Sequence, residues 1–504
     1  MKTKVTTPLM VVAILLSSLC FSKGVKAQSQ SQKTIVGYFP NWKWYRRNHV
    51  VNPKTIQYSK YTHINYSFFI PTTSGKIVES DAWADENLLL GEPDWQNGGY
   101  KANTNIIDLA HNAGTKVIMA VGGWNHSPLF PAIAKDDSKR ALMVSSIIDL
   151  VKKYRFDGVD MDWEYPGFAD HNGSPADTDN FTKLIRELRA ALTDLGKDTG
   201  KTYLLTSAFS TDIEKMKSID WDAVVPLLDM INVMTYDYFG AWDNTTNHNA
   251  PLYASGQGNP NFNINSSYKY LVDTYHIPSS KVNIGVAFYG RAQSGVSTLF
   301  SGGAKQVDQE TFPEDEGAPS YYNIMKRINQ YTRHWDDQAK VPYLTKSNGF
   351  VSYDDPESIG YKAQYVMDNN IGGVIIWEIT CDYMETSEGS GKIGATPLID
   401  KLHQVFDQTT GVSDIFKVTE NGNLSIYPNP SSTKGFITIL FDANENTDAS
   451  INIYNSTGQK VVDAENIRIT KGKNTIPISI DKAGIYILNI RAGKESIQEK
   501  LVVR

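Results

Sequence analysis

Three acidic residues, Asp160, Asp162 and Glu164, are separated by single apolar residues in the run Asp-Gly-Val-Asp-Met-Asp-Trp-Glu-Tyr-Pro at residues 157–166. A two-residue alternation is the period of a β-strand, so the three carboxyl groups are expected on one face of a strand. Carboxylates about 7 Å apart on one face cannot all ionise cheaply, so at least one should keep a proton near neutral pH. A protonated carboxylic acid beside ionised carboxylates is what the cleavage of a glycosidic bond requires.

The same run has two other interpretations. A calcium-binding loop is also rich in aspartate, but such a loop is polar and has a central glycine, whereas the spacers here are large and apolar. The run could also be a strand with an acidic face toward solvent. Its aromatic flanks, Tyr154 and Phe156 before it and Tyr165 after it, favour a buried strand with a sharp end. We therefore prefer the catalytic interpretation.

The fold that would position these acids is predicted from short apolar runs along the chain. We expect strands at residues 34–39, 61–69, 116–121, 156–164, 203–209, 230–236, 282–289 and 373–379, with amphipathic stretches such as 138–154 and 179–195 between them. Eight strands that alternate with helices predict an α/β fold, a (β/α)8 TIM barrel, whose active site lies at the carboxyl ends of the strands.

The spacing of the predicted strands is uneven. The seventh and eighth are separated by roughly 80 residues, far more than one crossover helix needs. Residues from about 292 to 350 are therefore expected to form a small α+β subdomain inserted into a catalytic domain of residues 30–408. A second insertion, at about 70–104, follows the second strand and carries Trp83 and Trp95.

The acidic run resembles the signature of family 18 glycoside hydrolases, the chitinase family, and further matches are spread over residues 34–380. Glu164, the last acid at the end of the fourth strand, is then expected to donate a proton to the leaving oxygen and later to act as base toward water. Asp162 lies on the same strand and is badly placed to attack the sugar. The resemblance implies that the 2-acetamido oxygen of the substrate attacks instead and forms a cyclic oxazolinium ion.

The resemblance also implies roles for three more residues in this mechanism. Asp162 would hold the acetamide N–H and stabilise the developing positive charge. Asp160 would share a proton with Asp162 and tune its pKa, although a purely structural role is an equal alternative. Tyr236 would donate a hydrogen bond to the acetamide carbonyl, for which a phenol that stays protonated at neutral pH is suited.

Substrate-binding residues are implied at the other strand ends. They are Tyr38, Trp42, Phe68, Gly123, Trp124, Tyr165, Met234, Asp237, Trp242, Arg291 and Trp377. Tyr38 is expected beneath the acids as a partner of Asp160, Trp377 under the distorted sugar, and Met234 in the pocket floor or simply in the barrel core. The four tryptophans can stack on the C–H faces of sugars, and a row of such rings indicates a polymeric substrate. Ala120 and Phe239 depart from the family, in which many members have Ser and His, so two polar contacts are absent.

The ends of the chain carry different signals. Residues 1–27, with Lys2, Lys4 and an apolar run, predict a cleaved signal peptide. After a polar stretch at 409–423 that is expected to be a linker, residues 424–504 show repeated β-runs typical of a small β-sandwich. Tyr427-Pro-Asn-Pro, Gly484-Ile-Tyr and the ending Lys-Leu-Val-Val-Arg504 resemble the C-terminal sorting domain of the type nine secretion system of Gram-negative bacteria.

A carbohydrate-binding module and an immunoglobulin-like spacer are the alternatives for residues 424–504. We prefer the sorting domain, because Tyr427, Tyr454 and Tyr486 fall at positions expected in a core and no Trp follows Trp377. The sorting domain implies a secretion machinery as partner and a secreted or surface-held protein.

Composition limits the remaining functions. The net charge of −6 disfavours nucleic acid and anionic membranes as partners, and no segment after the signal is apolar enough to span a membrane. Cys381 is the single cysteine of the mature chain, which excludes an internal disulfide. The histidines show no metal-binding spacing, and no phosphate loop is present, so we expect no metal or cofactor.

The sequence therefore predicts a secreted, monomeric chitinase that cleaves β-1,4-linked N-acetylglucosamine with retention. An endo-β-N-acetylglucosaminidase that acts on glycoproteins and a non-catalytic chitin-binding lectin are the alternatives on the same scaffold.

Overall fold

The structure is a computed structural model that describes residues 33–407, without 304–305, and residues 424–504, without 445, 456–457 and 493–494. The predicted signal peptide at 1–27 and the predicted linker at 409–423 lie outside the described residues.

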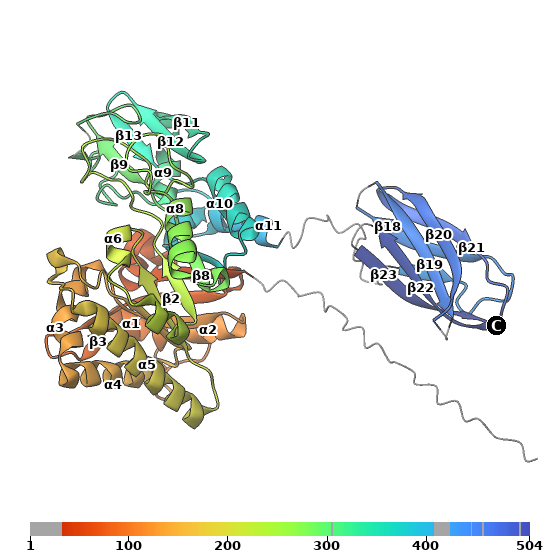
Figure 1. The fold of residues 1–504 in the computed structure, drawn as a ribbon, viewed down its shortest axis with the longest axis horizontal. Coiled ribbons are helices and arrows are strands. Elements are labelled where there is room, and N and C mark those ends of the chain that lie inside the picture. Colours follow the sequence, from red (N-terminus) through yellow and green to blue (C-terminus); the bar gives the residue numbers. More distant parts are fainter. Residues whose placement is uncertain (1–32, 304–305, 408–423, 445, 456–457, 493–494) are drawn as a thin grey trace, which may run out of the picture. The chain divides into compact units, whose positions relative to one another are not determined.

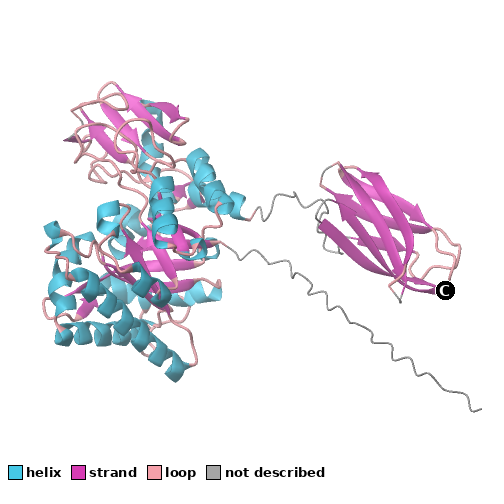
Figure 2. Cartoon of the chain, in the orientation of Figure 1, coloured by secondary structure: helices cyan, strands magenta, loops and turns pink. Residues whose placement is uncertain are grey.

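Parallel strands surrounded by helices form the first part of the described chain (Figures 1 and 2). The strand order is β1-β14-β8-β7-β6-β5-β4-β2, and pairing of β1 with β2 closes the ring. These strands are β1 (Thr34–Pro40), β2 (His63–Pro71), β4 (Lys116–Gly122), β5 (Gly158–Asp162), β6 (Leu204–Phe209), β7 (Met230–Val233), β8 (Val282–Ala287) and β14 (Gly373–Trp377). The predicted (β/α)8 barrel is confirmed, and all its strands end at the same mouth.

Helices follow most of the strands and pack on the outside of the barrel. They are α1 (Ala82–Leu89), α2 (Ile106–Asn112), α3 (Phe130–Lys135), α4 (Asp137–Tyr154), α5 (Asp177–Thr199), α6 (Ile213–Met216), α7 (Trp221–Val224), α8 (Ile264–Lys269), α10 (Pro356–Asp368) and α11 (Pro397–Phe406). Their starts follow local rules. The Asp136 carboxylate accepts hydrogen bonds from the first free N–H groups of α4. Asp355 and Ser358 form a capping box at the start of α10, whose first residue is Pro356.

The fourth barrel strand is shorter than predicted, because β5 ends at Asp162 and Glu164 lies beyond it. The reason is a change of hydrogen-bond partner. The Asp162 carbonyl accepts the N–H of Gly123, and the N–H of Glu164 donates to the Ser127 hydroxyl rather than to a neighbouring strand. Glu164 therefore lies just beyond the strand, although its carboxyl group still interacts with that of Asp162.

The predicted α+β insertion lies between β8 and β14. Its antiparallel sheet has the order β10-β9-β13-β12-β11 and is accompanied by α9 (Tyr321–Arg327). The strands are β9 (Arg291–Ser294), β10 (Gln306–Val307), β11 (Thr332–Asp336), β12 (Val341–Lys346) and β13 (Gly349–Ser352). A hairpin of β15 (Met384–Glu385) and β16 (Ile393–Ala395) follows β14.

The second predicted insertion contributes a short strand to the edge of the barrel sheet. This strand, β3 (Ile77–Glu79), pairs antiparallel with β2 and precedes α1. Trp83 and Trp95 of this region are 66% and 90% exposed, so neither ring contributes to the core.

Residues 424–504 form two antiparallel sheets around a hydrophobic core of their own. One sheet has the order β17-β18-β21 and the other the order β20-β19-β22-β23. The strands are β17 (Leu424–Tyr427), β18 (Ile437–Ala443), β19 (Thr447–Asn455), β20 (Lys460–Ile469), β21 (Gly472–Ile478), β22 (Gly484–Ala492) and β23 (Glu495–Val503). The predicted small β-sandwich is confirmed.

Two details of this sandwich differ from the prediction. Strand β20 was missed, because Asp463 and Arg468 interrupt its apolar pattern, which an edge strand tolerates. Of the three tyrosines expected in the core, only Tyr486 is buried there, whereas Tyr427 is exposed and Tyr454 lies outside the core cluster. In β17 the buried Leu424 and the half-buried Ile426 alternate with Ser425 and Tyr427, so the tyrosine faces outward.

Among the helices of the described ranges, none is both long and apolar enough to cross a membrane.

A buried ion pair joins α10, the helix that precedes β14, to Asp354 just before its N-terminus. Lys362 of α10 lies 2.6 Å from Asp354 Oδ2, and the two side chains are 0% and 1% exposed. The Ser358 hydroxyl adds a hydrogen bond of 2.7 Å to Asp354 Oδ1. Two charges so far from water remain only because each compensates the other.

We predict that Lys362→Met lowers the free energy of unfolding by about 3–5 kcal/mol, because Asp354 is left buried without its counter-charge. The measurement is the urea midpoint followed by far-UV circular dichroism. The double variant Lys362→Met/Asp354→Asn should recover most of the loss. Lys340→Met, which removes an exposed pair with Asp337, is the control and should leave the midpoint in place. An equal midpoint for the Lys362 and Lys340 variants would refute the prediction.

Candidate functional site

Asp160 lies in the centre of the barrel, where three side chains donate hydrogen bonds to it. The Tyr38 hydroxyl lies 2.6 Å from Oδ2, as the sequence predicts, and Asn232 Nδ2 lies 3.1 Å from Oδ1. The Thr206 hydroxyl makes a short contact to the same Oδ1. Burial raises the pKa of Asp160, and the hydrogen bonds oppose that rise. Asp160 is thus held in one orientation beneath Asp162.

Asp162 is 3% exposed, and its Oδ1 has no hydrogen-bond partner among the described residues. Burial, followed by the charges of Glu164 and Asp160, raises the pKa of Asp162 well above its usual range. A buried oxygen without a partner is costly, because its desolvation is not compensated. Asp162 can therefore accept a hydrogen bond from a bound ligand.

Glu164 is the most accessible of the three acids. Burial raises its pKa to about 7, and the charge of Asp237 acts in the same direction. The charge of Lys215 acts in the opposite direction. A carboxyl group that titrates near neutral pH can both donate and accept a proton under ordinary conditions.

Two glycines at the end of β4 allow the chain to pass this close to the acids. Gly122 has φ +118°, and a Cβ there would lie 2.2 Å from the Asp162 carbonyl oxygen. Gly123 has φ +83°, and its Cβ would lie 2.6 Å from the Phe68 ring. Any side chain at either position would displace the backbone of Asp162 or the aromatic ring beside it.

Tyr236 follows β7 and is packed against β8. Gly285 makes room for it, since a Cβ there would lie 2.7 Å from the phenol ring. Burial, together with the charges of Asp162 and Asp237, raises the pKa of Tyr236 well above its usual range. Its hydroxyl therefore stays protonated, and it makes no hydrogen bond within the described residues, so it can donate one to a ligand. Met234 is half-buried and packs on the barrel core.

Four rings from β1 and the turn of helix after it, β2 and β14 pack together on one side of the acids. We call them the aromatic group: Tyr38, Trp42, Phe68 and Trp377. Ring centroids lie 5.9 Å apart for Phe68 and Trp377, 6.0 Å for Trp42 and Phe68, and 5.6 Å for Tyr38 and Trp377. Trp42 is partly exposed and Trp377 half-buried, which leaves apolar ring surface for a ligand.

A second cluster of rings surrounds the backbone of Glu164. Trp124, which is half exposed, packs on Tyr165, Phe168 and His171, and His171 Nδ1 lies 2.6 Å from the Glu164 carbonyl oxygen. The Lys215 ammonium lies 4.9 Å from the centroid of the Tyr165 ring and 4.6 Å from that of Phe168. This cluster places a cation close to the acid.

Asp237 and Arg291, both predicted to bind sugar, bind each other. Arg291 Nη2 lies 2.6 Å from Asp237 Oδ1, which also accepts a hydrogen bond of 2.6 Å from the Tyr289 hydroxyl. The guanidinium lies 4.9 Å from the ring centroid of Trp242, whose side chain is exposed. The pair holds Trp242 and Tyr289 on the side of the mouth that borders the insertion.

Sequence reasoning missed several residues of the site. Thr206 and Asn232 lie on β6 and β7 at the level of Asp160, and Thr206 is its direct register partner. The inward layers of a (β/α)8 barrel, in which side chains of neighbouring strands meet, could have indicated them. No sequence signal indicates Lys215, because it comes from a short helix after β6.

The described residues contain no group of three or more His, Cys, Asp or Glu side chains arranged to hold a metal ion.

Comparison with known proteins agrees with this geometry. Residues 34–382 match glycosyl hydrolases family 18, and residues 425–504 match the secretion system C-terminal sorting domain, which indicates secretion. Chitinase A1 of Niallia circulans is 31% identical over 445 residues, which cover 78% of this chain and 63% of that relative. The chain thus spans less than two thirds of the length of Chitinase A1.

Solved structures show the same likeness. Chitinase ChiA74 from Bacillus thuringiensis has a TM-score of 0.66 at 26% identity and covers 94% of this chain and 85% of its own. Catalytic domain 2 of the Group II chitinase of Ostrinia furnacalis, solved as a mutant in complex with penta-N-acetylchitooctaose, has a TM-score of 0.64 at 28% identity. It covers 75% of this chain and 97% of its own. By its sequence match and its barrel, the chain belongs to glycosyl hydrolases family 18.

Proposed function

We propose that this protein is a secreted chitinase that hydrolyses β-1,4 linkages between N-acetylglucosamine units with retention. The observation that carries the proposal is the pairing of Glu164, whose pKa is raised to about 7, with the deeply buried Asp162. Asp162 has a free acceptor oxygen and follows Asp160 on one strand, so it is suited to hold a ligand N–H rather than to attack a sugar. Chitinase relatives and the complex of one of them with an acetylated chito-oligosaccharide support this substrate.

Each group takes one role in the proposed mechanism. The protonated Glu164 carboxyl donates its proton to the glycosidic oxygen while the substrate acetamide oxygen attacks the anomeric carbon. Asp162 accepts a hydrogen bond from the acetamide N–H and stabilises the positive charge, and the protonated Tyr236 hydroxyl donates to the acetamide oxygen. Glu164, now a carboxylate, takes a proton from the water that opens the oxazolinium ion. Two inversions at the anomeric carbon give retention.

Asp160 acts through Asp162 in this proposal. Its three donors fix its orientation, and its charge is among the causes that raise the pKa of Asp162. Burial favours the protonated form of Asp162. Its proton can be shared with Asp160 when Asp162 turns to the acetamide. The substrate would lie on the aromatic group, with Trp377 under the distorted sugar and Trp124 under the leaving part.

Glu164→Gln should lower kcat on chitin oligomers by about 10³-fold or more, because the amide cannot donate the proton, while oligosaccharide binding is kept. The measurements are a single-turnover assay and calorimetric titration with the hexamer. Glu310→Gln is the control, since Glu310 is exposed and makes no contact with the site. Unchanged turnover would refute the role of Glu164, and products released as the α anomer would refute retention. High-mannose glycopeptides cleaved faster than chitin oligomers would favour the endo-β-N-acetylglucosaminidase.

Lys215→Met should move the alkaline limb of the kcat/KM profile to higher pH. The acid must be protonated to work, and the nearby cation favours the carboxylate, so loss of Lys215 raises the pKa of Glu164 further. The other groups that face Glu164, namely Asp162, Asp237 and Tyr165, are unchanged in this variant. Lys215→Arg, which keeps the cation, and Lys217→Met on the exposed surface should leave the limb in place. A limb that stays or moves to lower pH in Lys215→Met contradicts the prediction.

We also propose that residues 1–27 direct the chain across the inner membrane of a Gram-negative cell and that residues 424–504 then direct it out of the periplasm. Deletion of residues 424–504 should leave active enzyme in the periplasm, because the barrel has its own core. Cell fractionation with a chitinase assay measures this. Normal export together with weaker binding to insoluble chitin would instead identify a carbohydrate-binding module.

A further inference from the structure

The loop that follows Glu164 folds back onto the backbone of that acid. His171 lies in this loop, at the end of the single helical turn Ala169–His171, and is 9% exposed. Its Nδ1 lies 2.6 Å from the Glu164 carbonyl oxygen. Because a carbonyl oxygen can only accept a hydrogen bond, Nδ1 carries the hydrogen and donates it. A buried donor thus holds the backbone of the residue whose carboxyl group titrates near neutral pH.

The backbone of Glu164 is also held by a second segment. Its N–H donates to the Ser127 hydroxyl at 2.7 Å. Ser127 belongs to the helical segment after β4, whereas His171 belongs to the loop after β5. The side-chain amide of Asn172 donates to the Pro128 carbonyl at 3.1 Å and joins the two segments. The N–H and the carbonyl of Glu164 are therefore both fixed by groups that lie outside β5.

Aromatic neighbours hold the His171 ring. Its centroid lies 4.3 Å from that of Trp124, in an edge-on arrangement, and 5.2 Å from that of Phe168. The Phe168 carbonyl also accepts the backbone N–H of His171 at 3.0 Å. The side chain therefore makes two separable contributions, which are a hydrogen bond to the Glu164 carbonyl and packing against Trp124.

The loop that carries His171 is fixed by its own contacts. The Asp177 carboxylate, which is buried, accepts the N–H groups of Gly167 and Ser174 at 3.2 and 2.8 Å. At Gly173 a Cβ would lie 2.4 Å from a backbone nitrogen of the same loop, so a larger residue there would force the loop apart. These contacts fix the place from which His171 donates.

We propose that His171 is a positioning residue for the acid Glu164. This inference rests on the proposed function, in which Glu164 protonates the leaving oxygen. The hydrogen bond from Nδ1 fixes the backbone from which the Glu164 side chain extends, so the carboxyl group lies at the distance from the glycosidic oxygen that proton transfer requires. The donor, and not the ring, performs this task.

Two substitutions separate the donor from the ring. His171→Phe keeps an aromatic ring against Trp124 but has no donor, and His171→Asn keeps an N–H near the place of Nδ1 but has no ring. The substrates are two aryl chitobiosides of equal length. The phenyl compound has a poor leaving group that needs a proton from the acid, whereas dinitrophenolate leaves without one. The measured quantity is kcat/KM.

His171→Phe should lower kcat/KM about 10- to 100-fold with phenyl chitobioside and less than about threefold with dinitrophenyl chitobioside, because a displaced acid slows only the substrate that needs the proton. His171→Asn should stay within about threefold of the unsubstituted enzyme with both substrates. His171→Gln, whose amide N–H is placed like Nε2 and not like Nδ1, should behave like His171→Phe.

His334→Phe is the matched control for these variants. His334 contacts Thr345 and Tyr343 within the insertion sheet, so its loss should change neither value. Far-UV circular dichroism in urea checks that each variant folds.

Three results would overturn the inference. They are full activity of His171→Phe with phenyl chitobioside, equal losses with the two substrates, and a large loss in His171→Asn. Glu164→Gln is the reference for the proposed chemistry and should show the same dependence on the leaving group. If Glu164→Gln loses activity equally with both substrates, the proposed role of Glu164 fails. If only the His171 variants lack the dependence, the positioning role fails and the chemistry stands.

Discussion

The site depends on keeping carboxyl groups inside a barrel from which water is excluded. Asp160 and Asp162 are both buried, and burial is the largest cause that raises the pKa of each acid. Removing a charge from water is expensive unless other groups replace the water. Tyr38, Thr206 and Asn232 do this for Asp160, whereas one oxygen of Asp162 has no replacement among the described residues. Asp160 is thereby stabilised, and Asp162 keeps an oxygen that can accept a hydrogen bond from a ligand.

The rest of the barrel mouth is shaped by this constraint. Glycines at the end of β4 and in the middle of β8 let backbone and phenol approach the acids where a Cβ would collide. Aromatic rings cover both sides, with Trp42 and Trp377 on one side and Trp124 and Tyr165 on the other. These rings lower the local polarity, which strengthens every remaining electrostatic interaction. Burial raises the pKa of Glu164, which lies between the two sides, to about 7.

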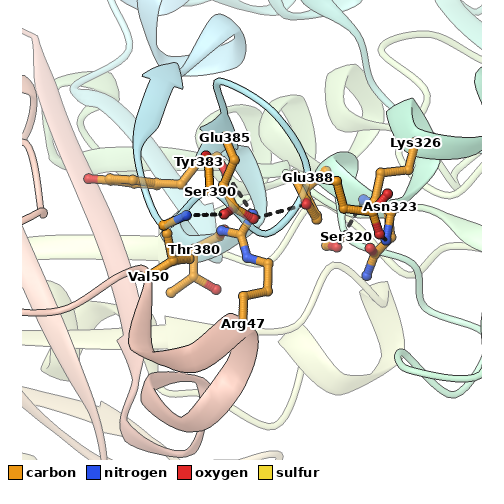
Figure 3. Close-up of polar contacts among 12 residues, drawn as sticks. Arg47, Val50, Ser320, Asn323, Lys326, Thr380, Tyr383, Glu385, Glu388 and Ser390 are labelled. Carbon is orange, nitrogen blue, oxygen red and sulfur yellow. Dashed lines mark hydrogen bonds and ion pairs between the residues drawn. The ribbon is translucent and has the colours of Figure 1, made fainter.

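The insertion contributes to this mouth in two places. At its first strand, Arg291 ties Asp237 to Trp242, so residues that follow β7 are fixed by residues that follow β8. At its helix α9, Tyr322 and Lys326 form contacts with Arg47 and Glu388, which join the insertion to the segment after β1 and to the β15–β16 hairpin (Figure 3). A subdomain that the barrel does not need for closure thus borders the mouth of the barrel.

The local sequence pattern alone predicts much of the fold of this protein. The alternation of acids and apolar residues at 157–166 predicts a buried acidic strand, and the apolar runs predict the barrel, the insertion and the sandwich, because strand period and burial depend on neighbouring residues. Neighbouring residues do not determine the path of the chain beyond Asp162, because the N–H of Glu164 donates to the Ser127 hydroxyl, which is 37 residues away in the sequence. Thr206 and Asn232 reach Asp160 across 46 and 72 residues, and Lys215 reaches Tyr165 from another strand end. Only the closed barrel brings such groups together, because their contacts depend on the register of strands and not on sequence spacing.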